Sequence, residues 1–200
     1  MKIINVIVRI KPLYRTLKKI KRKLIGISED SRCLSKKEVN FLLEYAKEGG
    51  YFLEVGCAFG QTTKTLSKKG FVVAIDPFPF YERNQVMGEY FEDIVVEFMK
   101  NIQGENICFF PLKSEDVEHN WKRFVNKKFD FIFIDGLHTY EQIKKDYAWV
   151  NHLKEDGYIL FHDTNMPQID KFIKEKPMKE LDLIEQFSSI KVFRKKRGEN

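Results

Sequence analysis

The chain has 200 residues, of which 43% are hydrophobic, and a formal net charge of +6. This length and composition predict one compact domain with an ordinary core and leave no room for a second full domain. Three cysteines without a C-x-x-C pair argue against a disulfide framework or a zinc site, and no apolar run approaches the roughly 20 residues that cross a bilayer, so we expect a cytoplasmic protein.

The N-terminal segment is basic and has a helical pattern. Lysines and arginines crowd residues 11–23 without one acid, and leucine or isoleucine recurs on one stripe at positions 13, 17, 20 and 24. Such a helix can lie on a membrane surface, contact nucleic acid, or pack on the domain or on a second subunit of a homo-oligomer. A solvated basic terminus is the alternative. We therefore divide the chain into a basic arm with its linker (1–31), a domain (32–195) and a tail (196–200).

Within the domain, strand and helix patterns alternate. The S-K-K-E pattern at Ser35 predicts a helix cap, and the helix that begins there leads into a strand that starts at Tyr51. Further strands are predicted over residues 71–75, 106–110, 129–134, 158–161, 181–186 and 190–194, and helices over 62–69, 85–101, 114–125, 139–153 and 168–174. Strands that are apolar on both faces and separated by helices indicate a parallel sheet covered on two sides. The last two strands, joined through Ser188 and Ser189, predict an antiparallel hairpin.

The first strand runs into a glycine turn, Y-F-L-E-V-G-C-A-F-G, at residues 51–60. Gly56 and Gly60 allow a ligand to approach the backbone closely, the helix that follows offers free N–H groups, and Glu54 adds a fixed acceptor. Glycines after a strand can also make a turn and nothing more.

Polar residues follow nearly every predicted parallel strand, where open sheets of this kind bind their ligands. They are Glu54, Asp76, Ser114, Glu115, Asp116, Asp135, His162 and Asp163. Asp76 closes F-V-V-A-I-D about twenty residues after the glycine turn, a position from which a carboxylate can accept both hydroxyls of an adenosine ribose.

Several segments together carry a family resemblance. L-E-V-G-C-A-F-G, V-V-A-I-D-P-F, F-D-F-I-F-I-D-G-L-H-T-Y-E-Q-I-K-K-D and D-G-Y-I-L-F-H-D resemble the class I S-adenosylmethionine-dependent methyltransferases. The chain is most similar to the small O-methyltransferases grouped with the macrolide-sugar (macrocin) and cephalosporin-cluster enzymes. The resemblance implies a doubly wound α/β, Rossmann-like fold with a seven-stranded, mostly parallel sheet and an antiparallel last strand. A nicotinamide-binding domain fits less well, because the turn lacks G-x-G-x-x-G.

The resemblance also implies a set of cofactor contacts. Glu54, Gly56 and Gly60, with Cys57 and Ala58 in the same turn, would hold the methionine part of S-adenosylmethionine. Ala58 stands where a middle glycine is common. Asp76 would contact the ribose, Ser114 and Glu115 would lie beside the adenine, and Asp135 would face the cofactor.

A second group of residues suggests metal-assisted chemistry. Asp135 and Asp163 end adjacent strands, and two carboxylates suit Mg²⁺ or another divalent metal that binds a substrate hydroxyl and lowers its pKa. His162 is a further candidate ligand, since some sugar-type relatives have an acid there; Thr164 replaces the asparagine of catechol-type relatives. In the alternative interpretation Asp163 caps the following turn and Asp135 binds backbone N–H groups.

His138, three residues after Asp135, is the candidate general base, because an ordinary histidine pKa of about 6.5 suits that role. A structural hydrogen bond or a metal-ligand role is the alternative. We expect His119 and His152 on the surface, Tyr140 and Trp149 in packing roles, and a loop with Phe78, Phe80 and Tyr81 beside the cofactor or acceptor.

The sequence thus predicts an enzyme that transfers a methyl group to a hydroxyl of a small molecule or sugar. RNA or protein methylation is a rival, because the chain ends are basic. A non-catalytic binding module that docks through the basic arm is the other rival.

Overall fold

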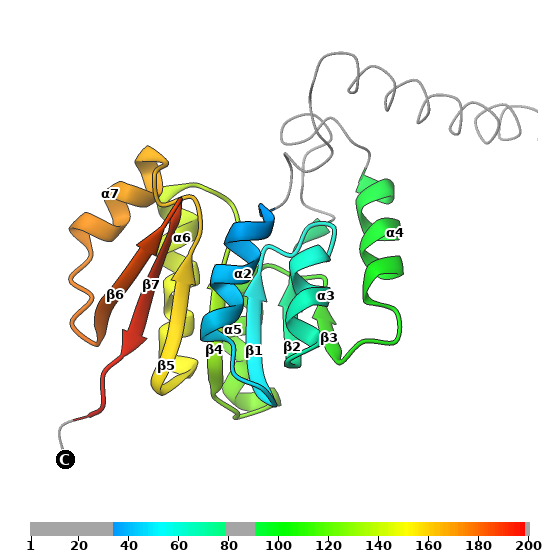
Figure 1. Ribbon diagram of the computed structural model, residues 1–200, viewed down its shortest axis with the longest axis horizontal. Helices are drawn as coiled ribbons and strands as arrows, with labels where there is room; N and C mark the ends of the chain where they lie inside the picture. Colours follow the sequence, from blue (N-terminus) through cyan, green and yellow to red (C-terminus); the bar gives the residue numbers. More distant parts are fainter. Residues whose placement is uncertain (1–33, 79–90, 199–200) are drawn as a thin grey trace, which may run out of the picture. The chain divides into compact units, whose positions relative to one another are not determined.

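The computed structural model describes residues 34–78 and 91–198 (Figure 1). The basic arm, Phe80 and Tyr81, and the first part of the helix expected over residues 85–101 lie outside the described residues. The division of the chain into arm, domain and tail therefore stays a prediction.

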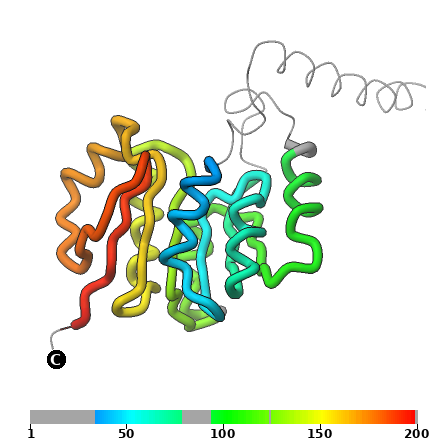
Figure 2. Tube along the Cα trace, viewed as in Figure 1, coloured from blue at the N-terminus to red at the C-terminus, as the bar shows by residue number. Residues whose placement is uncertain are grey.

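Seven strands form one sheet, in the order β3-β2-β1-β4-β5-β7-β6. They are β1 (Gly50–Val55), β2 (Gly70–Ile75), β3 (Ile107–Phe110), β4 (Phe129–Ile134), β5 (Leu153–Phe161), β6 (Leu181–Phe187) and β7 (Ile190–Lys195). The first five strands are parallel to one another, whereas β7 runs antiparallel to both β5 and β6. The predicted mostly parallel sheet with a reversed last strand is confirmed, as is the terminal hairpin. The tube in Figure 2 shows that the chain leaves β5, forms β6 at the outer edge of the sheet and returns as β7 between β6 and β5.

Helices cover both faces of the sheet, as its apolar central strands require (Figure 1). They are α2 (Lys36–Tyr45), α3 (Gln61–Ser67), α4 (Phe91–Ile102), α5 (Ser114–Phe124), α6 (Tyr140–Asp146) and α7 (Pro167–Glu175). Helices α5, α6 and α7 pack on the face that carries Leu53, Ile132 and Phe161. Helices α2, α3 and α4 cover the other face, where α4 packs on Ala74. No helix of the described part of the chain has the length and apolar character to span a bilayer.

The boundary between α6 and β5 differs from the prediction. The helix α6 ends at Asp146, a 3-10 helix η3 (Tyr147–His152) follows, and β5 already begins at Leu153. Leu153 pairs with Phe129, and the register then shifts, so that Lys154, Glu155 and Asp156 form a bulge. This exposed charged bulge resembles a helix end in sequence, which explains the wrong boundary at Tyr158.

Three of the side chains named from the sequence lie in the interior. His152 was expected on the surface but is buried, and its Nε2 lies 2.8 Å from Glu118 Oε1. The tighter 3-10 turn places this residue against α5. Phe78 lies in the core against Phe98 and Phe109. Trp149 is a core residue, as predicted.

Candidate active site

The parallel strands bring the predicted polar residues to one edge of the sheet. Glu54 lies near the end of β1, Asp76 directly follows β2, Asp135 directly follows β4, and His162 directly follows β5. Since β1, β2, β4 and β5 all run in the same direction, their carboxyl ends meet at that edge. The edge therefore holds the candidate site.

The glycine turn lies directly against this edge. Gly56 has φ +87°, and a Cβ atom there would lie 2.1 Å from the backbone oxygen of Asp135. Gly60 has φ +76°, and a Cβ atom there would lie 2.7 Å from the ring of Phe98. Both positions thus require glycine for conformation and for space. Cys57, between them, is buried in the core beneath α4.

Glu54 is buried, and burial raises the pKa of its carboxyl group to about 8. The nearby Thr63 hydroxyl opposes this rise in pKa, but within the described residues neither Glu54 Oε2 nor Thr63 Oγ1 makes a hydrogen bond of full geometry. A buried carboxylate oxygen without a partner is costly, unless a ligand supplies a donor. An ammonium group, such as that of the methionine part of S-adenosylmethionine, fits this oxygen in charge and hydrogen bonding.

Asp76 is also buried, and its Oδ2 accepts a hydrogen bond of 2.9 Å from the backbone N–H of Ala58. Ala58 adopts φ +40°, a left-handed backbone conformation that is uncommon for residues other than glycine. This alanine stands at the position where the family pattern commonly has a glycine. The carboxylate therefore ties the turn after β1 to the end of β2. Contact with a ribose stays a prediction.

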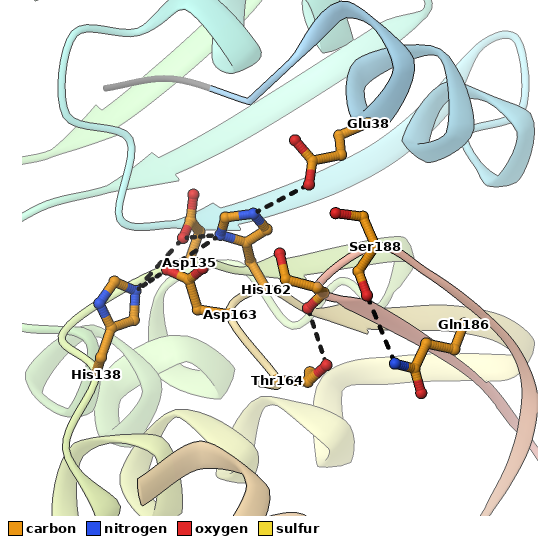
Figure 3. A network of polar contacts seen from close by, with 9 residues as sticks. Glu38, Asp135, His138, His162, Asp163, Thr164, Gln186 and Ser188 are labelled. Carbon is orange, nitrogen blue, oxygen red and sulfur yellow. Dashed lines mark hydrogen bonds and ion pairs between the residues drawn. The ribbon is translucent and has the colours of Figure 1, made fainter. Parts of the chain in front are cut away.

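The most concentrated group of polar side chains is the polar cluster, which we define as Asp135, His138, His162 and Asp163 (Figure 3). His138 Nε2 lies 3.0 Å from Asp163 Oδ2 and 3.7 Å from Asp135 Oδ1. His162 Nδ1 lies 2.9 Å from Asp135 Oδ1 and 3.4 Å from Asp163 Oδ2. Each imidazole therefore contacts both carboxylates, and the cluster joins the ends of β4 and β5.

Within this cluster, Asp135, His138 and Asp163 each offer a ligand atom, and these atoms lie within 4.8 Å of one another. Asp163 adopts φ +51°, a left-handed conformation that aspartate tolerates better than most residues. Within the described residues, the carboxylates of Asp135 and Asp163 contact histidine rings and not backbone N–H groups. The donor set of two carboxylates and an imidazole fits a divalent cation.

Ionisation in the cluster follows from this geometry. The carboxylates of Asp135 and Asp163 raise the pKa of His138 to about 9. Burial lowers the pKa of His162, but the same two carboxylates outweigh it and raise the value to about 10. The two histidines in turn hold the pKa of Asp163 well below its usual range. Without a bound cation, both rings are protonated at neutral pH, so His138 does not have the ordinary pKa on which its base role was predicted.

One member of the site was missed in the sequence. Glu38 on α2 lies 4.0 Å from His162 Nε2, on the opposite side of that ring from Asp135 (Figure 3). Its position in an S-K-K-E pattern indicated a helix cap, and this masked its proximity to the site. Thr164, the departure from the catechol-type pattern, donates its hydroxyl hydrogen bond to the backbone oxygen of Ser189 at 2.9 Å.

The residues predicted to lie beside an adenine are at the start of α5. Ser114 Oγ is buried and accepts a hydrogen bond of 2.8 Å from Trp149 Nε1. Glu115 accepts hydrogen bonds from Lys145 and Gln142 of α6. Asp146, which the sequence did not single out, is buried beside them, and burial raises its pKa to about 6. These contacts join α5 to α6 next to the candidate cofactor edge.

The sequence of the site matches a known family. A model of the family described as "Methyltransferase domain" matches residues 53–164, which begin in β1 and end just after Asp163. The chain belongs to this family. The predicted methyltransferase membership is thereby confirmed, and the matched segment contains the glycine turn and the whole polar cluster. No match was found among curated proteins.

Solved methyltransferase structures share the fold. The O-methyltransferase TomG from Streptomyces achromogenes, solved with SAM, is 11% identical and has a TM-score of 0.63 over 88% of this chain and 86% of its own. The N-methyltransferase NodS from Bradyrhizobium japonicum WM9 is 15% identical, with a TM-score of 0.58 over 84% and 99%. The TDP-rhamnose 3′-O-methyltransferase CalS11 is 15% identical, with a TM-score of 0.57 over 79% and 77%.

Proposed function

We propose that this methyltransferase transfers the methyl group of S-adenosylmethionine to a hydroxyl oxygen of a small molecule or sugar. The observation that carries the proposal is the polar cluster, which lies directly beside the glycine turn: Asp135 follows β4, and its backbone oxygen would meet a Cβ atom of Gly56 at 2.1 Å. The proposed site for the acceptor oxygen is thus adjacent to the proposed site for the cofactor.

The cofactor half of the proposal rests on the first strand and its turn. Glu54 offers an unpartnered buried oxygen to an ammonium group, and the turn between Gly56 and Gly60 leaves the backbone open to close approach. Asp76 lies at the end of β2, within reach of the same turn. When bound, S-adenosylmethionine supplies an electrophilic methyl group, and the protein contributes mainly alignment.

The choice of oxygen as the acceptor rests on the cluster. The shared fold does not decide it, because both O- and N-methyltransferases have this fold. Two carboxylates with an imidazole suit a cation, and a cation of this kind would bind an acceptor hydroxyl and lower its pKa. Asp135 and Asp163 would hold Mg²⁺ or a similar ion, with His138 or His162 as a further ligand.

The proton of the acceptor hydroxyl needs a base within the same cluster. The two histidines hold the pKa of Asp163 well below its usual range, so its carboxylate is a weak base. His138 can receive the hydroxyl proton only after it has released the proton that the two carboxylates hold on its ring. A cation at the carboxylates would favour that release, because it replaces the positive charge of the imidazolium. His138 as base is thus part of the proposal for the metal-bound protein.

The proposal is tested in two stages. Calorimetric titration with S-adenosylhomocysteine should give saturable binding, and Glu54→Gln should weaken it by about tenfold or more, since a charge-assisted hydrogen bond is lost. Glu97→Gln, exposed on α4, is the matched control. Transfer of labelled methyl groups to panels of sugars and catechols, with and without Mg²⁺, then identifies the acceptor. Absence of any cofactor binding would refute the proposal.

A further inference from the structure

A hollow lies at the edge of the sheet opposite the candidate active site. It occupies about 420 Å³ at the amino ends of β1 and β2, between the end of α3 and the segment that follows α5. This volume is within the range of small-ligand sites. We call this hollow the amino-edge groove.

Aromatic rings form one wall of the groove. Tyr51 and Phe71 are directly paired across β1 and β2, and their rings stack at 5.5 Å and 18°. Tyr51 stacks in turn on Phe129, and Phe129 stacks on Trp121. Tyr51 is only 8% exposed, whereas Phe71, the last ring of the row, is 41% exposed. A large exposed ring supported by three buried ones is a rigid, flat platform on which another planar ring can stack.

Lysines line this platform, while the carboxylates of Glu48, Glu105 and Asp130 contact other lining residues from outside the groove. The lining includes Lys68, Lys69 and Lys127 and contains no carboxylate. Lys69 is not available to a ligand, because its Nζ donates hydrogen bonds to the backbone oxygens of Leu43 and Ala46 at the end of α2. Lys68 forms no ion pair within the described residues, and Lys127 lies 4.1 Å above the Tyr51 ring. Two lysines are therefore available to an anion beside the aromatic wall.

We propose that the amino-edge groove binds a nucleoside phosphate, with the base stacked on Phe71 and the phosphate between Lys68 and Lys127. A flat apolar ring next to lysines matches a ligand that combines a planar ring with an anion, and stacking plus cationic contacts is how proteins bind nucleotides without reading their sequence. Asn106, also in the lining, can donate its side-chain amide to the sugar or phosphate. The site is separate from the cofactor edge and does not depend on the proposed methyl acceptor.

The test is a titration of the full chain, followed by amide chemical shifts, with uridine monophosphate as the probe. A pyrimidine nucleotide avoids the adenosine of the proposed cofactor. We expect saturable shifts at residues 49–51, 68–71, 106 and 127. Uridine and inorganic phosphate should each bind about tenfold more weakly than uridine monophosphate, since each supplies one half of the contacts. Shifts confined to other parts of the chain, or no saturation, would overturn the proposal.

Variants separate the two halves of the site. Phe71→Ala should weaken binding about tenfold, whereas Phe71→Tyr, which keeps a ring, should retain it. Lys68→Glu on the surface should also weaken binding about tenfold and reduce its salt dependence. Lys122→Glu, exposed on α5 outside the groove, makes the same charge change and should have little effect. Equal losses of affinity in Lys68→Glu and Lys122→Glu would mean general electrostatic attraction and would overturn the proposed binding site.

A final arm distinguishes the source of the nucleotide. If hexauridylate binds much more tightly than the monophosphate and gives the same groove shifts, the groove holds one nucleotide of a single strand. If the two bind equally, the ligand is a free nucleotide. Binding of neither would contradict the proposal.

Discussion

A Cβ atom at Gly56 would lie 2.1 Å from the backbone oxygen of Asp135, so the glycine turn and the polar cluster are packed in direct backbone contact. Any displacement of one must therefore move the other. This contact couples the proposed cofactor site to the proposed metal site through backbone atoms, which have no alternative rotamers to relieve a clash.

The first prediction concerns this contact. Gly56→Ala should destabilise the fold by about 3 kcal/mol or more, because it adds a backbone clash to the cost of a side chain at φ +87°. Gly104→Ala is the matched control: Gly104 has φ +78° but nothing within 4 Å of an added Cβ atom, so it should cost only about 1–2 kcal/mol. Urea denaturation measures both. Equal losses would show that the close approach has no energetic weight.

The second prediction concerns the pH dependence of stability at Glu54. Burial raises the pKa of this carboxyl from 4.5 to about 8, so over that interval the folded protein binds a proton that the unfolded chain has lost. The free energy of unfolding should therefore fall as pH rises from about 5 to 8, by up to about 1.4 kcal/mol per pH unit from this group. Glu54→Gln should remove that slope.

Two comparisons make this measurement specific. Glu97→Gln, exposed on α4, should keep the pH slope of the unmodified protein. Saturation with S-adenosylhomocysteine should flatten the slope, because an ammonium partner stabilises the ionised carboxylate. A slope that Glu54→Gln leaves unchanged would show that this carboxyl does not titrate in that interval.

The third prediction concerns the cation. Asp163→Asn should lower Mn²⁺ affinity by at least about tenfold in calorimetric titration, because it removes a carboxylate from the donor set. Asparagine tolerates the left-handed φ of +51°, so the backbone should be retained. Asp170→Asn on α7, where the carboxylate pairs with Lys174, is the control. Unchanged Mn²⁺ affinity in Asp163→Asn would remove the metal assignment.

Much of the fold could be predicted because parallel strands carry a strong signal. Runs such as F-D-F-I-F-I in β4 are buried on both faces, and their carboxyl ends must meet at one edge. The convergence of Asp135 and Asp163 follows from that rule alone. The start of β5 could not be predicted, since the bulge at Lys154 depends on pairing with Phe129, a contact that no local pattern records.

The missed features are those that depend on distant contacts. Glu38 approaches His162 only because α2 crosses the sheet above β5, as its contact between Tyr45 and Tyr158 shows. The raised pKa of His138 requires both carboxylates to contact its ring, and the spacing of residues along the sequence fixes neither of these distances. The amino-edge groove joins residues from several separate segments, which no local sequence pattern brings together.

The fourth prediction concerns the hydrogen bond between Trp149 and Ser114, which joins η3 to the start of α5. Ser114→Ala should destabilise the protein by about 1–3 kcal/mol, because it leaves the buried indole N–H without its acceptor. Trp149→Phe removes the N–H itself, so in a double-mutant cycle the second change should cost less when Ser114 is already alanine. Additive effects would show that this bond contributes nothing. If titration with S-adenosylhomocysteine shows that folded Ser114→Ala keeps its affinity, the hydroxyl serves the α5 contact and not the adenine.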